Sequence, residues 1–168
     1  RIEESETSFR KVILLKPDYA EAYNNLGGAL QDLGRIEESE TSFRKVILLK
    51  PDFAEAHYNL GCTLQDLGRI EESETSFRKA ILLKPDFAEA HRIITMTKKF
   101  YSMDEQYLKM KELYINKDTS KEKLCHINFA LAKACDDLGD FEQAFTHYRE
   151  GNQIRKNLLN YDISQDIE

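Results

Sequence analysis

The chain has 168 residues, of which 41% are apolar, and a formal net charge of −6. Its Lys and Arg residues are scattered among Asp and Glu, whereas nucleic acids and anionic membranes require a basic surface, so neither is an expected partner. No apolar run approaches the roughly 20 residues that a membrane span needs, and no signal peptide opens the chain, so we expect a cytoplasmic protein.

The chain has three cysteines, Cys62, Cys125 and Cys135, and none belongs to a C-x-x-C pair. An odd number without such spacing favours reduced, buried thiols over a disulfide framework. We therefore expect the three side chains to behave as small apolar residues.

The first predicted element, residues 1–19, recurs almost unchanged at residues 35–53 and 69–87, a period of 34 residues. A fixed period of this length is typical of a solenoid, in which each repeat contacts only its neighbours. Because the chain begins in the middle of a repeat, we expect residues 1–19 to be a half repeat that supplies a second helix only. The chain is then expected to be a piece of a longer protein.

The next part of the chain contains one complete repeat. Asp18 and Glu21 form a D-x-x-E pattern that predicts an N-cap for a first helix, AEAYNNLGGALQDL. Gly34 follows this helix and is expected to take the left-handed conformation at its C-terminal end. A second helix with apolar residues at helical spacing is predicted over residues 36–49, and Pro51 ends it. The unit is therefore an antiparallel helix–turn–helix.

An aromatic residue, a Leu-Gly pair, a closing Gly, small residues and a final Pro recur at fixed positions. The first copy carries Tyr23, Leu26, Gly27, Leu30, Gly34, Ile36, Ser39, Phe43, Val46 and Pro51, and the second carries His57, Leu60, Gly61, Leu64, Gly68, Ile70, Ser73, Phe77, Ala80 and Pro85. This pattern resembles the tetratricopeptide repeat (TPR). The resemblance implies an all-α fold, a right-handed superhelical α-α solenoid of helix–turn–helix repeats. It would span residues 1–168 as a single domain, with full repeats at 20–53 and 54–87.

The third unit, residues 88–118, departs from this pattern. Its first helix, AEAHRIITMTKKF, carries Thr95 where the earlier copies have Gly, and no Gly closes it. A second helix is predicted to restart at the sequence DEQ and to point its apolar residues inward. These apolar residues are Met103, Tyr107, Met110, Leu113 and Tyr114. Residues 119–124 form a linker and helix start, where Thr119 and Glu122 match a capping box.

The fourth unit, residues 125–158, recovers the pattern. Its motif residues are Leu131, Cys135, Gly139, Phe141, Ala144, Tyr148 and Gly151. Gly139 lies 71 residues after Gly68, which is two periods plus three residues, so the junction before this unit is longer than standard. The second helix is predicted to run on to Leu158. Residues 159–168 form an acidic tail that is a candidate to begin another helix.

No arrangement of residues in the chain predicts catalysis. His57 and His91 occupy the position that Tyr23 holds in the first copy, so they are expected to pack between helices. His126 and His147 fall on different helices, without carboxylates or Cys at metal-ligand spacing. No Gly-rich phosphate loop, nucleophile elbow or H-E-x-x-H motif is present. We therefore expect a chain that is not an enzyme and that uses no cofactor and no metal.

The candidate binding residues come from the TPR resemblance, because in that family the first helix of each repeat lines a concave groove. Carried over by position, they are Glu21, Asn24, Asn25, Gly28, Gln31 and Asp32 in the first full repeat, Glu55, Tyr58, Asn59, Cys62, Gln65 and Asp66 in the second, and Glu89, Arg92, Ile93, Met96, Lys99 and Phe100 in the third. The resemblance thus implies a non-catalytic scaffold that binds a protein or peptide in this groove.

Asn25 and Asn59 recur at the same position, which resembles the asparagine ladder of O-linked N-acetylglucosamine transferases. In that family carboxamides hold an extended peptide backbone, because an Asn side chain donates and accepts like a peptide unit. The ladder is interrupted in the third and fourth units, and an Asn can equally brace neighbouring helices, so both roles stay open. Asn24 and Tyr58 stand where chaperone-binding relatives carry the cations of a carboxylate clamp, so acidic chaperone tails are not expected ligands.

The second half of the chain, residues 88–168, resembles the region that precedes the catalytic domain of bacterial TPR sulfotransferases. Its most specific part is the run FALAKACDDLGDFEQAF, followed by YREGN. The phosphosulfate-binding loop of those enzymes is absent, so any such activity would lie downstream of Glu168. The alternative function is therefore a substrate-presenting arm of a sulfotransferase. A glycosyltransferase arm is a weaker version, because the second half lacks regular repeats.

The lone first helix carries an apolar face made of Ile2, Phe9, Val12 and Ile13, which a preceding helix would normally cover. Terminal repeats of solenoids usually need a polar cap. We therefore expect this face to be exposed and to associate with another copy of the chain.

Overall fold

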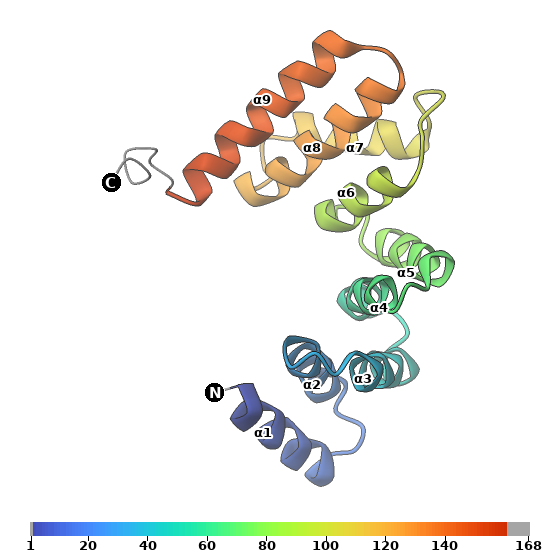
Figure 1. The fold of residues 1–168 in the computed structure, drawn as a ribbon, viewed down its shortest axis with the longest axis vertical. Helices are drawn as coiled ribbons and strands as arrows, with labels where there is room; N and C mark the ends of the chain where they lie inside the picture. Colours follow the sequence, from blue (N-terminus) through green and yellow to red (C-terminus); the bar gives the residue numbers. More distant parts are fainter. Residues whose placement is uncertain (1, 161–168) are drawn as a thin grey trace. The chain divides into compact units, whose positions relative to one another are not determined.

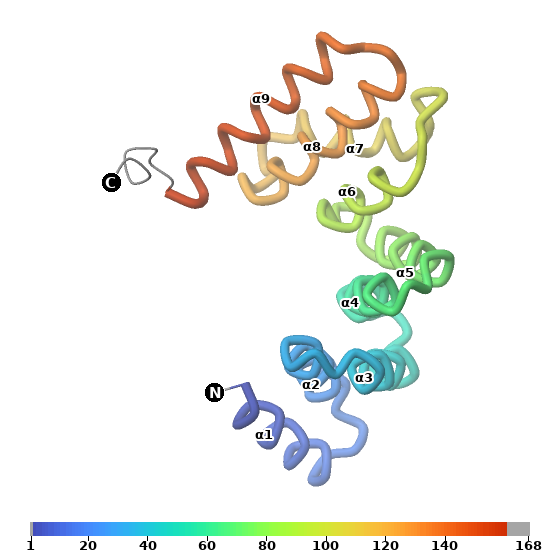
Figure 2. Tube along the Cα trace, in the orientation of Figure 1, coloured from blue at the N-terminus to red at the C-terminus, as the bar shows by residue number. Residues whose placement is uncertain are grey.

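The computed structural model describes residues 2–160 and contains α-helices but no strand in that range. Figure 1 shows the helices in chain order, and Figure 2 shows the same chain as a trace. The helices are α1 (Ile2–Leu15), α2 (Ala20–Asp32), α3 (Ile36–Leu49), α4 (Ala54–Asp66), α5 (Ile70–Leu83), α6 (Ala88–Thr97), α7 (Glu105–Ile115), α8 (Lys121–Asp137) and α9 (Phe141–Leu158). They belong to two compact units, Arg1–Lys84 and Pro85–Glu168. No helix in residues 2–160 is both long and apolar enough to cross a membrane.

The first unit consists of α1 followed by two helical hairpins, α2–α3 and α4–α5. α1 packs against α2, and α3 packs against α4, so consecutive helices contact each other along this unit (Figure 1). Phe43 of α3 is fully buried, and Leu60 and Leu64 of α4 belong to the same apolar cluster. This arrangement confirms the predicted all-α solenoid of helix–turn–helix repeats.

Close contact between the two helices of each hairpin depends on a glycine. A Cβ atom on Gly27 would lie only 2.7 Å from Cε1 of Phe43, and a Cβ atom on Gly61 would lie 2.7 Å from Cε1 of Phe77. The hydroxyl of the buried Ser39 donates a 2.8 Å hydrogen bond to the carbonyl of Gly27. A Ser is therefore tolerated at this tight contact because its polar atom is satisfied.

The predicted end of the first helix is confirmed. Gly34 has a φ of +72°, its amide donates to the carbonyl of Gln31 at 2.9 Å, and the amide of Arg35 donates to the carbonyl of Leu30 at 2.9 Å. These two bonds satisfy carbonyls that the helix itself leaves unpaired.

The predicted N-cap at Asp18 is wrong. Tyr19 is the N-cap residue of α2, and its side chain makes no capping hydrogen bond. Pro17 and Asp18 are the central residues of a tight turn, in which the amide of Tyr19 donates to the carbonyl of Lys16 at 3.2 Å. The proline fixes this turn one residue before the helix begins, and the same arrangement precedes α4, whose N-cap is Phe53.

Arg–Glu ion pairs connect each repeat to the next one in the first unit. Arg69 bonds to Glu72 on its own helix at 2.6 Å and to Glu40 on the preceding second helix at 2.7 Å. Arg44 completes the network, with contacts of 2.7 Å to Glu40 and 3.3 Å to Glu72. The same four-residue network occurs one repeat earlier. It consists of Glu6, Arg10, Arg35 and Glu38.

In the second unit, α8 and α9 form a hairpin, and α6 packs mainly on α8 instead of on α7. α6 ends at Thr97, and Lys98 is extended, with φ −116° and ψ 160°. Phe100 turns back into the core, where it is 1% exposed and its amide donates to the carboxylate of Asp137 at 2.9 Å. The predicted helix AEAHRIITMTKKF is therefore too long, because Phe100 is drawn into the core in a non-helical segment.

The second helix of the degenerate unit is α7, which Asp104 caps by accepting a 2.9 Å hydrogen bond from the amide of Tyr107. Tyr107, Met110 and Leu113 are buried as predicted. The prediction that Met103 points inward is wrong, because this residue precedes the helix and is 59% exposed.

The predicted capping box before α8 is displaced by one residue. Ser120 is the N-cap, and its hydroxyl accepts from the amide of Lys123 at 3.3 Å. Thr119 instead donates to the carbonyl of Leu113 at 2.8 Å, which fastens the linker to the end of α7. α9 reaches Leu158 as predicted. The helix proposed within the tail falls largely on residues 161–168, outside the described residues.

Candidate peptide-binding face

The predicted groove residues of the first unit lie on α2 and α4, and none of them is fully buried. Asn25, Asp32 and Asp66 are exposed. The half-buried members are Glu21, Asn24, Gly28, Gln31, Glu55, Tyr58, Asn59, Cys62 and Gln65. We refer to these twelve residues as the α2–α4 face.

Two hydrogen bonds join α2 to α4 across this face. The Nδ2 of Asn59 donates to the Oδ1 of Asn24 at 3.2 Å, and the Nε2 of Gln31 donates to the Oδ2 of Asp66 at 3.1 Å. Asn59 therefore braces the helices, and it does so through Asn24 and not through Asn25. The sequence left bracing and ligand contact open for both ladder residues; the hydrogen bond shows bracing by Asn59, and ligand contact by Asn25 and Asn59 stays a prediction.

Asn25 differs from its counterpart Asn59. Its carboxamide is exposed, and the structure shows no hydrogen bond between it and another residue in the range 2–160. It borders a hollow of about 340 Å³. The hollow is lined by Ile2, Ser5 and Phe9 of α1, by Asn24, Asn25, Gly28, Ala29 and Asp32 of α2, and by Asn59 of α4. A polar wall with donors and acceptors thus faces an apolar wall supplied by α1.

The expected exposure of the first helix is met only in part. Ile2 is 44% exposed, but Phe9, Val12 and Ile13 are half-buried, because α1 packs against α2. The most exposed apolar residues of α1 lie elsewhere, at Leu14 and Leu15 near its C-terminal end.

Charged side chains occupy both ends of the α2–α4 face. Glu55 pairs with Lys84 at 2.7 Å, and Glu21 lies 3.7 Å from Lys50. The hydrogen bond from Lys84 keeps the pKa of Glu55 below its usual value. At the opposite end, Asp32 makes no ion pair with any described residue, so the hollow has an available carboxylate at its rim.

Cys62 lies near the middle of α4, where burial raises the pKa of its thiol. A raised pKa keeps the sulfur protonated at neutral pH, so it is a poor nucleophile. All three cysteines are free thiols; Cys125 and Cys135 are buried as expected, whereas Cys62 is half-buried.

The groove residues predicted in the third repeat belong to the second unit and do not form one row. Arg92 lies on α6, with its guanidinium 5.3 Å from the ring centre of Phe129, and Met96 is 63% exposed. Lys99 follows the end of α6, with its ammonium 5.8 Å from the ring centre of Tyr101, and Phe100 is buried. The predicted positions of Lys99 and Phe100 in the groove are therefore wrong, because the helix ends at Thr97. Glu89 and Ile93 remain half-buried on α6.

Two of the histidines contact backbone carbonyl oxygens of neighbouring turns. The Nε2 atoms of His57 and His91 lie 2.9 and 3.0 Å from the carbonyl oxygens of Pro51 and Pro85, so each imidazole holds the turn that precedes its helix. No group of three His, Cys, Asp or Glu residues within residues 2–160 could hold a metal ion.

A buried polar pair in the second unit had no signal in the sequence. The Nδ1 of His147 lies 2.9 Å from the Oδ1 of Asn128, and both side chains are 1% exposed. The ring of the half-buried Tyr114 meets the imidazole edge-on, with ring centres 4.8 Å apart. Asn128 and His147 lie 19 residues apart, on α8 and α9, so only the packing of the hairpin reveals the pair.

The family model of the tetratricopeptide repeat matches residues 20–53, 54–87 and 126–158, which make up more than half of the chain. The first two ranges coincide with the predicted full repeats. The third begins one residue after the predicted start of the fourth unit. No curated protein sequence matches the chain.

Several solved structures resemble this chain. A mutant of the Thermobaculum terrenum O-GlcNAc transferase is 28% identical, with a TM-score of 0.57, over 66% of this chain and 22% of that chain. A crystal structure of MamA is 18% identical, with a TM-score of 0.63, over 95% of this chain and 92% of that one. MamA from Desulfovibrio magneticus RS-1 is 20% identical, with a TM-score of 0.61, over 93% of this chain and 86% of that one. The chain thus spans about a fifth of the transferase, and the likeness to MamA concerns the fold.

Proposed function

Because this chain belongs to the tetratricopeptide repeat family, we propose that it is a non-catalytic scaffold that binds an extended segment of a partner protein on the α2–α4 face. The observation that carries the proposal is the exposed carboxamide of Asn25 beside the bonded pair of Asn24 and Asn59. The pair joins α2 to α4 before a ligand binds, so little conformational entropy of the protein is lost on binding.

The chemistry of the hollow indicates which kind of segment it takes. The carboxamide of Asn25 both donates and accepts, which matches the alternating N–H and C=O groups of an extended backbone. Ile2 and Phe9 supply an apolar wall, and the carboxylate of Asp32 lies at the rim. The preferred ligand is therefore a peptide with an apolar side chain and a nearby Lys or Arg.

A selection followed by calorimetry tests this proposal. Random dodecapeptides displayed on phage are selected on the immobilised chain, and an enriched peptide is titrated against wild type, Asn25→Ala and the control Asn152→Ala. Asn25→Ala removes no hydrogen bond seen between described residues, so its effect reports ligand contact. We expect about a fivefold loss of affinity, near the ~1 kcal/mol of one hydrogen bond, and no loss for the exposed Asn152 on α9. Unchanged affinity in folded Asn25→Ala contradicts the proposed contact.

A second candidate function is a substrate-presenting arm of a larger transferase. The 28% identity to the O-GlcNAc transferase over 66% of this chain favours a glycosyltransferase. The sulfotransferase version rests only on the sequence resemblance of residues 88–168. Sequencing the gene beyond Glu168 distinguishes the two, because each enzyme needs its own catalytic domain there. A stop codon or an unrelated domain would end this candidate and leave the scaffold role intact.

A further inference from the structure

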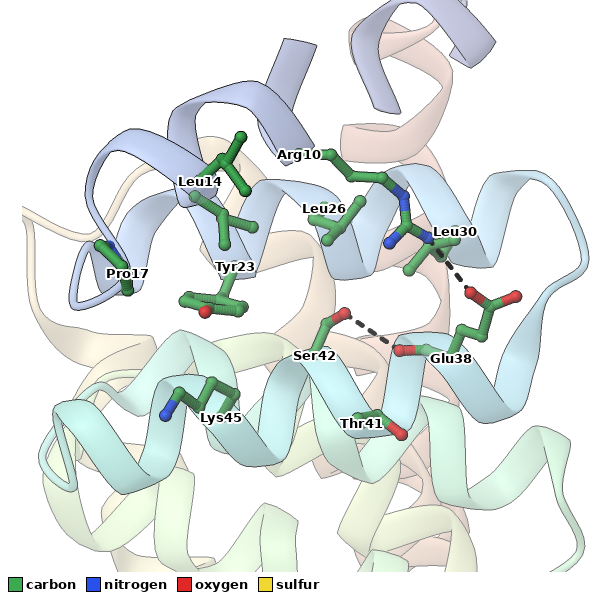
Figure 3. A pocket seen from close by; sticks show the side chains of 11 residues that line it. Arg10, Leu14, Pro17, Tyr23, Leu26, Leu30, Glu38, Thr41, Ser42 and Lys45 are labelled. Carbon is green, nitrogen blue, oxygen red and sulfur yellow. Dashed lines mark hydrogen bonds and ion pairs between the residues drawn. The ribbon is translucent and has the colours of Figure 1, made fainter. Parts of the chain in front are cut away.

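Two hollows that are distinct from the α2–α4 face open in the first unit, and they repeat with the sequence. The first lies between α1 and α3, with α2 beneath it, and has a volume of about 710 Å³ (Figure 3). The second lies one repeat later, between α3 and α5, with a volume of about 570 Å³. Corresponding residues line both. They are Ile13, Leu14, Pro17, Tyr23 and Leu26 in the first hollow and Ile47, Leu48, Pro51, His57 and Leu60 in the second.

Each hollow combines an apolar lining with one positive charge that no described residue neutralises. Leu14 is 82% exposed and Leu48 is 73% exposed at the edges of the two hollows. Arg10 and Arg44 also line them, but each is already paired with a Glu of the next repeat. Lys45 and Lys79 complete the linings, and the structure shows no ion pair between either of them and another residue in the range 2–160. A ligand with apolar groups and carboxylates would fit this combination.

The second unit exposes a surface of that kind on α9. Phe141 and Phe145 are 68% and 67% exposed, and Tyr148 is 39% exposed. Their spacing of four and three residues places them on one side of the helix, and we call them the α9 stripe. In the first unit the residue that corresponds to Tyr148 is Phe43, which is fully buried with leucines of α4. The stripe therefore lacks the cover that the regular repeat gives.

Carboxylates accompany the α9 stripe. Asp136 and Glu142 are exposed and make no ion pair with another described residue. Glu142 follows Phe141 in the first turn of α9, and Asp136 lies in the last turn of α8, which leads into α9. The stripe thus offers aromatic rings and unpaired negative charge, the complement of the two hollows.

We propose that the α9 stripe of one copy docks in a hollow of the first unit of a second copy. The aromatic rings fill the apolar lining, and Asp136 and Glu142 approach Lys45 or Lys79. The two surfaces differ, so the contact is heterologous and leaves a free hollow and a free stripe at the two ends of each complex. Association is weak, because only a few aromatic side chains are buried, and it grows with concentration.

A charge swap tests the proposal with the full chain in sedimentation velocity, up to millimolar concentration. The wild type is expected to show an average mass that rises with concentration. Lys45→Glu combined with Lys79→Glu makes the hollows acidic, and Asp136→Lys combined with Glu142→Lys makes the stripe basic. Each double variant alone should remain monomeric, whereas an equimolar mixture should associate again, because acidic hollows then meet basic stripes.

A matched pair of leucine variants separates the hollows from general surface hydrophobicity. Leu14→Ser with Leu48→Ser should abolish association. The control, Leu15→Ser with Leu82→Ser, removes side chains that are 81% and 72% exposed but line neither hollow, and it should associate like the wild type. Circular dichroism checks that every variant is folded. A wild type that stays monomeric throughout, association that survives the charge swap, or equal effects of both leucine pairs would overturn the proposal.

Discussion

Gly27 and Gly28 show that two neighbouring residues of one helix can have different physical roles. A Cβ atom on Gly27 would collide with the ring of Phe43, whereas a Cβ atom on Gly28 would meet nothing within 4 Å. Gly27 belongs to the contact between α2 and α3, and Gly28 borders the hollow of the α2–α4 face. The repeat pattern identifies the first of these roles, because Gly61 recurs at the position of Gly27.

This difference predicts opposite effects of the same substitution. Gly27→Ala should lower the free energy of unfolding by about 1–3 kcal/mol, because the buried ring of Phe43 has to move. Gly28→Ala should leave it unchanged or raise it by about 0.5–1 kcal/mol, because Ala favours the helix. Urea unfolding followed by circular dichroism measures both values. Equal effects at the two positions would show that the contact with Phe43 does not control the packing.

The buried imidazole of His147 makes the stability of the second unit depend on pH. Burial, with a smaller effect from Lys111, lowers the pKa of His147, and its Nε2 has no hydrogen-bond partner. A group with a lowered folded-state pKa takes up its proton more readily when unfolded. Its contribution to stability is therefore present above the unfolded pKa, near 6.5, and is lost as the pH falls from there towards the folded pKa.

We predict that the ring C–H signal of His147 in NMR spectra stays at its neutral position when the pH falls from 7.5 to about 6, below the ordinary His pKa of roughly 6.5. In the same range the midpoint of urea unfolding should fall. His91 is also buried, and its pKa is likewise lowered by burial, so it should behave in the same way. A His147 signal that titrates at the ordinary pKa would contradict the account.

At the scale of elements, the Arg–Glu networks give a physical role to four of the positions that recur in the second helices and their N-caps. Arg69 reaches back from the start of α5 to Glu40 on α3, and Arg35 reaches from α3 to Glu6 on α1. Each second helix therefore has to carry both the Arg and the Glu for the next contact. The side chain of Glu40 is only 15% exposed in this position.

Glu40→Gln should destabilise the first unit by about 1 kcal/mol, because a networked, mostly buried carboxylate loses two Arg contacts. Glu74 is the matched control, since it holds the same position one repeat later but pairs only with Arg78 on its own helix. Glu74→Gln should cost about 0.3 kcal/mol, as for a single exposed pair on a helix. Thermal unfolding of both variants measures the difference. If the two costs agree, the contact between repeats contributes nothing.

The regular helices could be predicted because local residues fix their ends. Gly34 and Pro51 stop the helices through backbone geometry alone, so the predicted bounds agree closely with the structure. The degenerate unit was predicted less well, because its end depends on a long-range contact between Phe100 and Asp137. The positions on the α2–α4 face followed from the TPR resemblance, but the pairing of Asn59 with Asn24 depends on how the two helices sit against each other.

At the scale of the whole molecule, the near-identical and the variable helices of the first unit have different roles. α1, α3 and α5 repeat almost the same sequence and hold successive repeats together. α2 and α4 differ where Tyr23 is replaced by His57 and Asn24 by Tyr58. In the scaffold that we propose, these first helices select the ligand, while the repeated second helices keep them in register.

The central claim, that Asn25 holds the backbone of an extended peptide, is tested most directly by a double-mutant cycle. A peptide selected on the wild-type chain is made in its unmodified form and in ester forms. In each ester form, one backbone amide is replaced by an ester, and the position of the ester is moved along the peptide in turn. The unmodified peptide and each ester form are titrated calorimetrically against wild type and Asn25→Ala. We predict that one ester weakens binding to the wild type but has no further effect on Asn25→Ala, because both changes remove the same hydrogen bond. Strictly additive losses at every position would contradict the claim.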